Sequence, residues 1–196
     1  MAILKIARMG HPILRMKSTP VEDPTAQEIR YFVDDMMDTL DDSGGVGLAA
    51  PQVHVPLRLV IFKVPAARAA HERYKAAGLD EESEEIPLTV LINPEIEVLG
   101  NESNAAYEGC LSIPEMMGEV YRHTHIRYRG VGLDGEPIER EARDFHARVV
   151  QHECDHLDGI LYPQRISDMR TFGYNDELRK SIAPSNGEEN EEADEP

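Results

Sequence analysis

Apolar residues at helical spacing predict a helix near the start of the chain. The positions concerned are Ile29, Phe32, Val33, Met36, Met37 and Leu40. Their steps of three and one place them all on one face, so the pattern predicts a helix of about four turns that packs against a core. The preceding TAQE (25–28) has the Thr-x-x-Glu pattern of a capping box, and the helix is expected to end within DDSGG (41–45).

A second helix is predicted from about Asp144. Its apolar and histidine positions recur at helical spacing: Phe145, Val149, His152 and His156. Gly159 stands just past the last of them, where a helix commonly ends. Both histidines therefore share the inward-facing stripe, and two imidazoles among apolar residues are costly to bury unless something binds them.

The segments between these helices have patterns typical of strands. They are LRLVIFKV (57–64), LTVLINPEIEVL (88–99), EVYRHTHIRYRGVGL (119–133) and IERE (138–141). Turns are expected at Asn93-Pro94, which would divide the second segment into two strands, and at Asp134-Gly135, a strong hairpin sequence. The order of elements predicts an α+β fold, with short antiparallel or mixed strands around the central helix that carries the two histidines.

Length and charge define the expected domain organisation. The chain of 196 residues suits one catalytic domain, expected over 1–187. Eleven acids lie in two runs, DEESEE (80–85) and EENEEADEP (188–196), and removing them from the net charge of −17 leaves −6. We interpret 66–86 as an acidic insertion over the sheet and 188–196 as a flexible acidic tail, because such a composition cannot offset the entropy of ordering.

Composition also excludes several classes of partner. The lysines and arginines do not gather as a nucleic-acid-binding surface requires. No apolar run approaches the roughly 18 residues that span a bilayer, and no apolar stretch with a cleavage site follows the N-terminus. We therefore expect no membrane association and a cytoplasmic location. The two cysteines, Cys110 and Cys154, are too few for a disulfide framework.

The strongest chemical signal is HECDH (152–156), an H-E-x-x-H pattern. On a helix, His152 and His156 lie one turn apart on the same face and can bind one metal ion together. Glu153 lies beside them, where it could take a proton from an activated water molecule. Two surface or core histidines with an exposed glutamate would produce the same pattern without any metal.

The pattern leaves the third metal ligand open. A catalytic divalent site usually has three protein ligands, and zinc proteases obtain the third from a His or Glu downstream. Downstream of His156 there is no further histidine, and the acids Asp168, Asp176 and Glu177 lie in a polar terminal segment. Upstream, Cys110 in EGCLS (108–112) offers a thiolate, unless it is a small buried hydrophobe. Cys154 falls on roughly the opposite helix face from His152 and is assigned to the core.

A third stretch, GVGLAAPQ (45–52), combines small residues with Gln52, an amide that can donate a hydrogen bond. Small residues allow a backbone to approach a ligand closely. The stretch lacks the pattern of a phosphate-binding loop, and no strand precedes it as a dinucleotide fingerprint requires. Taken alone, it is equally consistent with a tight connection.

Together, GVGLAAPQ, EGCLS and QHECDHLDG resemble, in this order, the three signature motifs of the peptide deformylase family. GHPILRMKSTPV (10–21) and IRYRGVGLDGEPI (126–138) are also similar, so the resemblance covers about residues 3–165. It implies the family's fold and three metal ligands: Cys110, His152 and His156. It further implies Glu153 as general base and acid. It implies Gln52 and Leu111 as catalytic hydrogen-bond donors, and Gly45 and Arg122 as substrate-binding residues. The acidic insertion, Met116-Met117 and the acidic tail depart from the family pattern.

The resemblance implies hydrolysis of the N-formyl group from the N-terminal methionine of new proteins, with release of formate. It implies Fe²⁺ in the cell, with Zn²⁺, Ni²⁺ or Co²⁺ able to substitute. Formyl-Met nascent peptides would be the substrates, with transient proximity to the ribosome, although RNA would repel the anionic tail. Two other hypotheses remain: a zinc endopeptidase with a downstream third ligand, and a non-catalytic homologue that binds N-termini.

Overall fold

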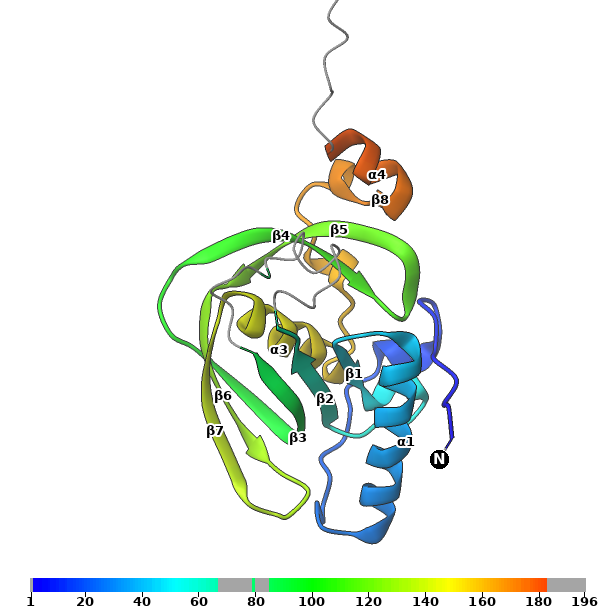
Figure 1. The fold of residues 1–196 in the computed structure, drawn as a ribbon, viewed down its shortest axis with the longest axis vertical. Coiled ribbons are helices and arrows are strands. Elements are labelled where there is room, and N and C mark those ends of the chain that lie inside the picture. Colours follow the sequence, from blue (N-terminus) through cyan, green and yellow to red (C-terminus); the bar gives the residue numbers. More distant parts are fainter. Residues whose placement is uncertain (1, 67–78, 80–84, 183–196) are drawn as a thin grey trace, which may run out of the picture.

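The computed structural model describes residues 2–66, 79 and 85–182, and its architecture is two antiparallel sheets packed around one helix. The larger sheet has the strand order β1-β2-β3-β6-β7, and the smaller has the order β4-β5-β8. Helix α3 (Asp144–Leu157) contacts strands of both sheets and lies between them (Figure 1). The predicted α+β class, with a central helix that carries the two histidines, is confirmed.

The strands of the larger sheet are β1 (Gly47–Ala49), β2 (Leu59–Val64), β3 (Ile86–Val98), β6 (His125–Val131) and β7 (Pro137–Arg143). Those of the smaller sheet are β4 (Ser103–Cys110), β5 (Ile113–His123) and β8 (Gly173–Tyr174). The remaining elements are α1 (Gln27–Ser43), α4 (Asn175–Ile182) and the 3-10 turns η1 (Pro12–Arg15), η2 (Ala50–Val53), η4 (Tyr162–Arg165) and η5 (Met169–Thr171).

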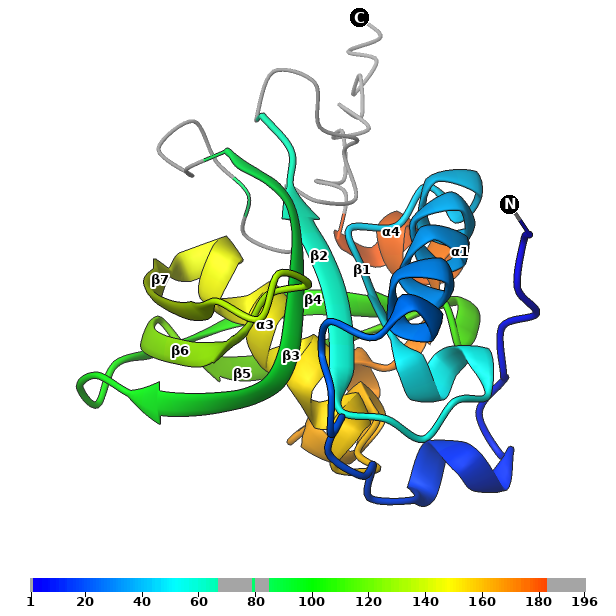
Figure 2. The ribbon, with the colours of Figure 1, turned by 90° about the horizontal axis from the view of Figure 1, so that it is seen from below.

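Strand β2 is buried on both faces, which explains its continuous apolar sequence. Leu59 and Ile61 belong to the core cluster that includes α1, whereas Val60 and Phe62 belong to the cluster that includes α3. Because successive side chains of a strand point to opposite faces, one strand joins two cores. Helix α1 covers the side of β2 that faces away from α3 (Figure 2).

The predicted first helix is present, but the predicted capping box is wrong. Helix α1 begins at Gln27, and its N-cap is Ala26, which has no side-chain acceptor to offer. Thr25 instead donates its hydroxyl to Asp23 at 2.7 Å, so this threonine belongs to the preceding turn. The predicted end is confirmed: Gly44 adopts φ 62° and donates its N–H to carbonyls of the last turn.

The expected turn at Asn93-Pro94 is also wrong, because β3 continues through it as one strand. The pairing with β6 shifts register between Ile92 and Glu95, which is a bulge rather than a reversal. Asn93 adopts φ 51°, and its side-chain amide bonds both the N–H and the carbonyl of Val21 at 2.9 Å. The bulge therefore directs the Asn93 side chain toward the segment that contains Val21, and the two hydrogen bonds hold that segment against β3.

The long strand predicted over 119–133 is in fact two strands in different sheets. Strand β5 ends at His123 and β6 begins at His125, with Thr124 between them. The N–H of Thr124 donates to Glu102 and its carbonyl accepts from Asp144, so this residue links the two sheets to the start of α3. Alternation of apolar residues continues across Thr124 and gives no sign of the change of sheet.

Other predicted elements are confirmed, and some predictions fall outside the described residues. The turn at Asp134-Gly135 joins β6 to β7, and Gly159 follows α3 with φ 73°. Most of the acidic insertion, at 67–78 and 80–84, and the whole tail 188–196 lie outside the described residues; Leu79 is buried in the core. Within the described residues no helix is both long and apolar enough to cross a membrane.

Buried His146 should make folding stability depend on pH. It packs against Tyr128 and Phe62, and burial, with repulsion from Arg140, lowers its pKa from 6.5 to about 4. The unfolded chain therefore binds the proton more readily than the folded chain. The stability that neutral His146 contributes is complete above pH 6.5 and is lost as the pH falls through about 4. His146→Gln should remove about 3 kcal/mol of pH-dependent unfolding free energy over this window.

The measurement is urea denaturation of both proteins at pH 7, 5.5 and 4. The control Met9→Leu alters an exposed residue that does not titrate, and it should leave the pH dependence unchanged. If wild type and His146→Gln lose stability in parallel, the buried imidazole has no such effect.

Candidate metal centre

Three potential metal ligands converge on one side of α3. The ligand atoms of Cys110, His152 and His156 all lie within 4.8 Å of one another, and Cys110 Sγ is 3.4 Å from His156 Nε2. Both histidines lie one turn apart on the helix, with their rings 5.0 Å apart between centroids. The cysteine is half-buried and the histidines are largely shielded from solvent, so the three groups form an enclosed donor set.

The hairpin between β4 and β5 brings the cysteine to the helix. Cys110 is the last residue of β4 and pairs with Ile113 of β5, so Leu111 and Ser112 form the turn between them. The register shifts between Gly109 and Cys110, and this irregularity lies at the cysteine itself. The upstream ligand left open by the sequence is thus placed beside the helix by the fold.

The donor set fits a divalent metal ion. An ion about 2.3 Å from a thiolate and about 2.0–2.1 Å from imidazoles keeps tetrahedral ligand atoms about 3.5 Å apart, close to the sulfur–nitrogen separation seen. Three ligands leave a fourth position for water or substrate. Among the described residues, the downstream acids Asp168, Asp176 and Glu177 do not join this group.

The two histidines differ in their electrostatic surroundings. Burial lowers the pKa of His156 well below its usual value, which favours the neutral imidazole that a metal requires. Burial also opposes a charge on His152, but hydrogen bonds to Cys110 and Glu108 outweigh it and raise that pKa well above its usual value. Metal binding at His152 is therefore coupled to release of a proton.

Glu153 is buried beside the two histidines, and its carboxylate occupies the space that a side chain at position 47 would fill. Its Oε2 atom has no hydrogen-bond partner within the described part of the chain. Burial raises the pKa of its carboxyl to about 7, against the opposing attraction of His152. A Cβ on Gly47 would overlap the Glu153 carboxylate, so this glycine of β1 is required for the close approach. An acceptor in this state can take and return a proton near neutral pH.

Gln52 is fixed with its amide NH₂ toward the cysteine. Its Oε1 accepts from the Ala49 N–H at 2.8 Å, and its Nε2 lies 3.4 Å from Cys110 Sγ and 3.2 Å from Ser112 Oγ. The residue is buried, on the 3-10 turn η2. The predicted donor is therefore oriented by the backbone of its own motif and directed at the metal centre.

The other predicted site residues lie near the centre or just behind it. A Cβ at Gly45 would approach Leu111 Cδ1 to 3.2 Å, so Gly45 and Leu111 line the same space. Arg122 is buried, and its guanidinium bonds Glu108 and Asp155. Its contacts place it behind His152 rather than on an open binding surface.

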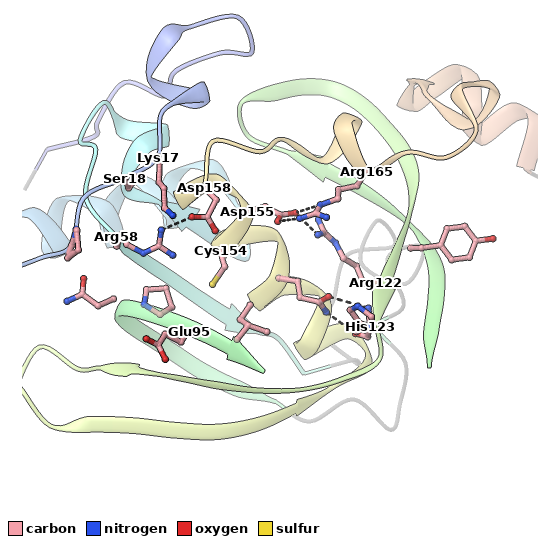
Figure 3. Close-up of a pocket in the computed structure, with 16 residues that line it drawn as sticks. Lys17, Ser18, Arg58, Glu95, Arg122, His123, Cys154, Asp155, Asp158 and Arg165 are labelled. Carbon is pink, nitrogen blue, oxygen red and sulfur yellow. Dashed lines mark hydrogen bonds and ion pairs between the residues drawn. The ribbon is translucent and has the colours of Figure 1, made fainter. Parts of the chain in front are cut away.

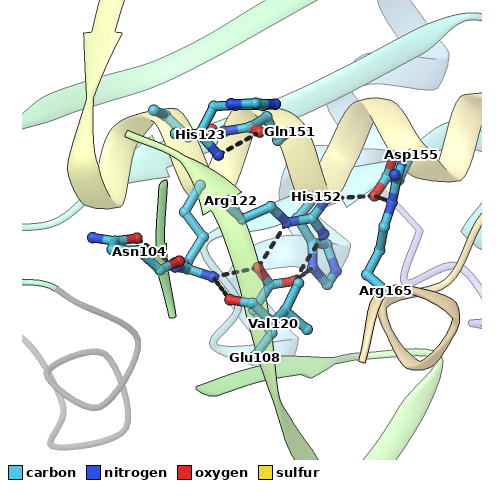
Figure 4. Close-up of polar contacts among 11 residues, drawn as sticks. Asn104, Glu108, Val120, Arg122, His123, Gln151, His152, Asp155 and Arg165 are labelled. Atoms are coloured by element: carbon cyan, nitrogen blue, oxygen red, sulfur yellow. Dashed lines mark hydrogen bonds and ion pairs between the residues drawn. The ribbon is translucent and has the colours of Figure 1, made fainter. Parts of the chain in front are cut away.

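Sequence reasoning missed Glu108, a carboxylate behind the metal ligands. Glu108 Oε2 lies 2.8 Å from His152 Nδ1, and Arg122 donates to the same carboxylate (Figure 4). A second arginine, Arg148, also donates to it. Burial opposes the charge on this carboxylate, but hydrogen bonds and attraction from His152 and Arg122 outweigh burial and hold the Glu108 pKa far below its usual value. Two signals were available: Glu108 lies two residues before Cys110 in EGCLS, and Arg148 precedes His152 by one helical turn.

The other face of α3 borders a groove of about 940 Å³ that lacks all three ligands. Figure 3 shows Asp155 joining Arg122 to Arg165 there, while Asp158 pairs with Arg58. Cys154 lines this groove, belongs to the core and is buried, as predicted. The groove meets the Glu108 network through Arg122, but the candidate chemistry is on the opposite side of the helix.

The sequence matches a family model described as Polypeptide deformylase over residues 3–172. It is 47% identical over 180 residues to peptide deformylase 1 of Bordetella pertussis, covering 92% of this chain and 97% of that protein. It is 47% identical over 176 residues to peptide deformylase 1 of Nitrosomonas europaea, covering 90% of this chain and 94% of the relative.

Solved structures with the same fold include a Met-Ala-Ser-bound class I type b peptide deformylase from Acinetobacter baumannii. It matches this chain with a TM-score of 0.75 and 34% identity, covering 84% of this chain and 99% of that structure. The peptide deformylase from Ehrlichia chaffeensis matches with a TM-score of 0.74 and 29% identity, covering 92% and 96%.

Proposed function

The chain belongs to the polypeptide deformylase family, and from this premise we propose how its residues remove the formyl group from N-terminal methionine. The observation that carries the proposal is the convergence of Cys110, His152 and His156 beside a buried carboxylate with an unpartnered oxygen. These residues supply a metal site, a base and a shielded space in one place. The net reaction adds water across the formyl C–N bond and yields formate and a free amine.

Cys110, His152 and His156 would hold the metal, and Fe²⁺ is our proposal for its identity in the cell. A bound divalent ion lowers the pKa of a water molecule and polarises a carbonyl oxygen. The donor set is also suited to Zn²⁺, Ni²⁺ or Co²⁺, because imidazole and thiolate bind all of them. Metal analysis after anaerobic purification decides between these ions.

Glu153 acts as the general base and then as the general acid. Its carboxylate takes a proton from the attacking water and returns it to the methionine nitrogen as the C–N bond breaks. A carboxyl pKa near the working pH suits both steps, because Glu153 must release the proton as readily as it accepts it. Gly47 keeps this carboxylate close to the histidines, since no side chain intervenes.

The Gln52 amide and the Leu111 N–H stabilise the negative charge that develops on the formyl oxygen. Preorganised donors aimed at that charge lower the barrier without further rearrangement. The bond from Gln52 to Ala49 supplies this preorganisation. One Gln52 N–H must exchange its present contact, with Cys110 or Ser112, for the substrate oxygen.

Gly45 is the proposed substrate-facing residue, and Arg122 is proposed to support substrate binding from behind the site. Gly45 lines the space beside Leu111, where a side chain would crowd a substrate. Arg122 supports that space indirectly, through Glu108 and the hairpin that carries Cys110. Formylated nascent peptides are the substrates that the family implies, and proximity to the ribosome in the cytoplasm is part of the proposal.

A panel of blocked peptides tests the function directly. The enzyme loaded with Fe²⁺ without oxygen should release formate from formyl-Met-Ala-Ser, and its rate on acetyl-Met-Ala-Ser should be at least about 100-fold lower, since the enclosed site disfavours a larger acyl group. Chelation should abolish activity and metal addition should restore it. Cleavage inside unblocked peptides would favour an endopeptidase, and peptide binding without formate release would favour a non-catalytic homologue.

A further inference from the structure

Every acceptor position of the Glu108 carboxylate is occupied. Oε1 accepts from Arg122 Nε at 2.9 Å and Arg148 Nη1 at 2.8 Å; Oε2 accepts from Arg122 Nη2 at 2.9 Å and lies 2.8 Å from His152 Nδ1. A carboxylate has about four lone-pair positions, so Glu108 is saturated. Three of these contacts come from arginines, and the fourth orients a metal ligand.

Arg148 reaches this carboxylate from the same helix as the ligand. It precedes His152 by one turn of α3, and its buried guanidinium also donates to the Val120 carbonyl at 2.9 Å. Its other nitrogen, Nη2, donates to both oxygens of Asn104, the carbonyl at 3.0 Å and Oδ1 at 2.7 Å. Arg148 therefore links α3 to β4 and β5 at the point where Glu108 contacts His152.

Arg122 alone does not direct its whole positive charge at Glu108. Its charge is shared between Glu108 and Asp155, and Asp155 also binds Arg165. The charges alternate from Glu108 through Arg122 and Asp155 to Arg165, and they balance without Arg148. Arg148 adds a positive charge that has no second carboxylate partner among the described contacts, so its charge is directed to Glu108.

We propose that Arg148, anchored by Asn104, is a positioning residue that holds Glu108 against His152 and thereby fixes this imidazole for metal binding. The proposal deepens the function above and rests on its metal site. A carboxylate behind a metal-bound histidine fixes the ring orientation and its tautomer. Arg148 extends this support by one further step, because it prevents Glu108 from rotating away.

Two substitutions test the proposal in the full-length chain. Arg148→Met should weaken Co²⁺ binding by about 10–100-fold, the usual effect of losing outer support of a metal ligand. Asn104→Ala changes only an exposed residue that anchors the outer end of Arg148, so it should fold and weaken Co²⁺ binding by a few fold. The control Arg30→Gln removes an arginine that donates to the Leu133 carbonyl near α1, and it should leave Co²⁺ affinity unchanged.

Affinity is measured by competition with a chelator, and the visible absorption of bound Co²⁺ reports the geometry of its ligands. Both Arg148→Met and Asn104→Ala should shift this spectrum, which a general loss of stability would not do. Wild-type affinity and spectrum in both would overturn the proposal; if Arg148→Met does not fold, Asn104→Ala decides it. Because no substrate is present, failure here leaves the proposed catalytic roles intact, whereas absence of Co²⁺ binding by wild type would refute the metal site itself.

Discussion

Glu153→Gln should lower kcat for formyl-Met-Ala-Ser by about 10³–10⁴-fold while the chain keeps its metal. The change replaces one oxygen by an amide of nearly the same size, so the side chain still fits under Gly47. Proton transfer by a positioned side chain contributes about 10²–10⁴-fold, and Glu153 is assigned two such transfers, which places the loss at the upper end. The metal should remain because the three ligands are unchanged. Initial rates of formate release and metal content per chain measure the two effects separately.

Glu119→Gln is the control for this experiment. Glu119 is a half-buried carboxylate on β5 that makes none of the contacts of the metal centre, and its substitution should leave kcat within about twofold of wild type. A Glu153→Gln enzyme within tenfold of the wild-type rate would refute the assigned role. Loss of metal in proportion to activity would also refute it, because Glu153 would then support the site rather than move protons.

The site residues whose relative positions can be predicted from the sequence are those that lie on one helix. His152, Glu153 and His156 lie within one and a half helical turns of about 3.6 residues each, so their mutual placement follows from the helix alone. Cys110 is different, because its distance from the histidines depends on how a hairpin packs on α3. Residue spacing left it as one option among several, and the resemblance to the family selected it.

The network behind the ligands depends on tertiary structure at every contact. Glu108 and Arg148 come from different elements, 40 residues apart in the sequence, and the other partners of Arg148, Asn104 and Val120, are 44 and 28 residues from it. Single-residue patterns do not show which buried charges will meet. The position of Arg148 one turn before His152 indicated a shared helix face, but not its partner.

The errors in the predicted fold have the same physical origin. Asn93-Pro94 has the composition of a turn, yet β3 absorbs it as a bulge because the Asn93 amide satisfies both backbone groups of Val21. At Thr124 the chain changes sheet without any change in its alternating pattern. Local propensity indicates where extended structure occurs, whereas long-range hydrogen bonds decide which strands it joins.

Cys110→Ser should remove most of the metal and, with it, activity. The substitution replaces a thiolate ligand by a hydroxyl that stays protonated and binds soft divalent ions poorly. Loss of outer support for a ligand already weakens metal binding by about 10–100-fold, so loss of the ligand itself should exceed about 100-fold. Metal content after dialysis against a weak chelator, together with formate release, measures the result.

Cys154→Ala is the matched control, because it removes the other cysteine, which is buried in the core on the groove side of the same helix. It should keep one metal ion per chain at the cost of some stability. The comparison also separates the deformylase site from a zinc-protease site, in which a downstream residue would be the third ligand. Full metal retention by Cys110→Ser would support that alternative, whereas loss in Cys110→Ser but not in Cys154→Ala assigns the third ligand to the hairpin between β4 and β5.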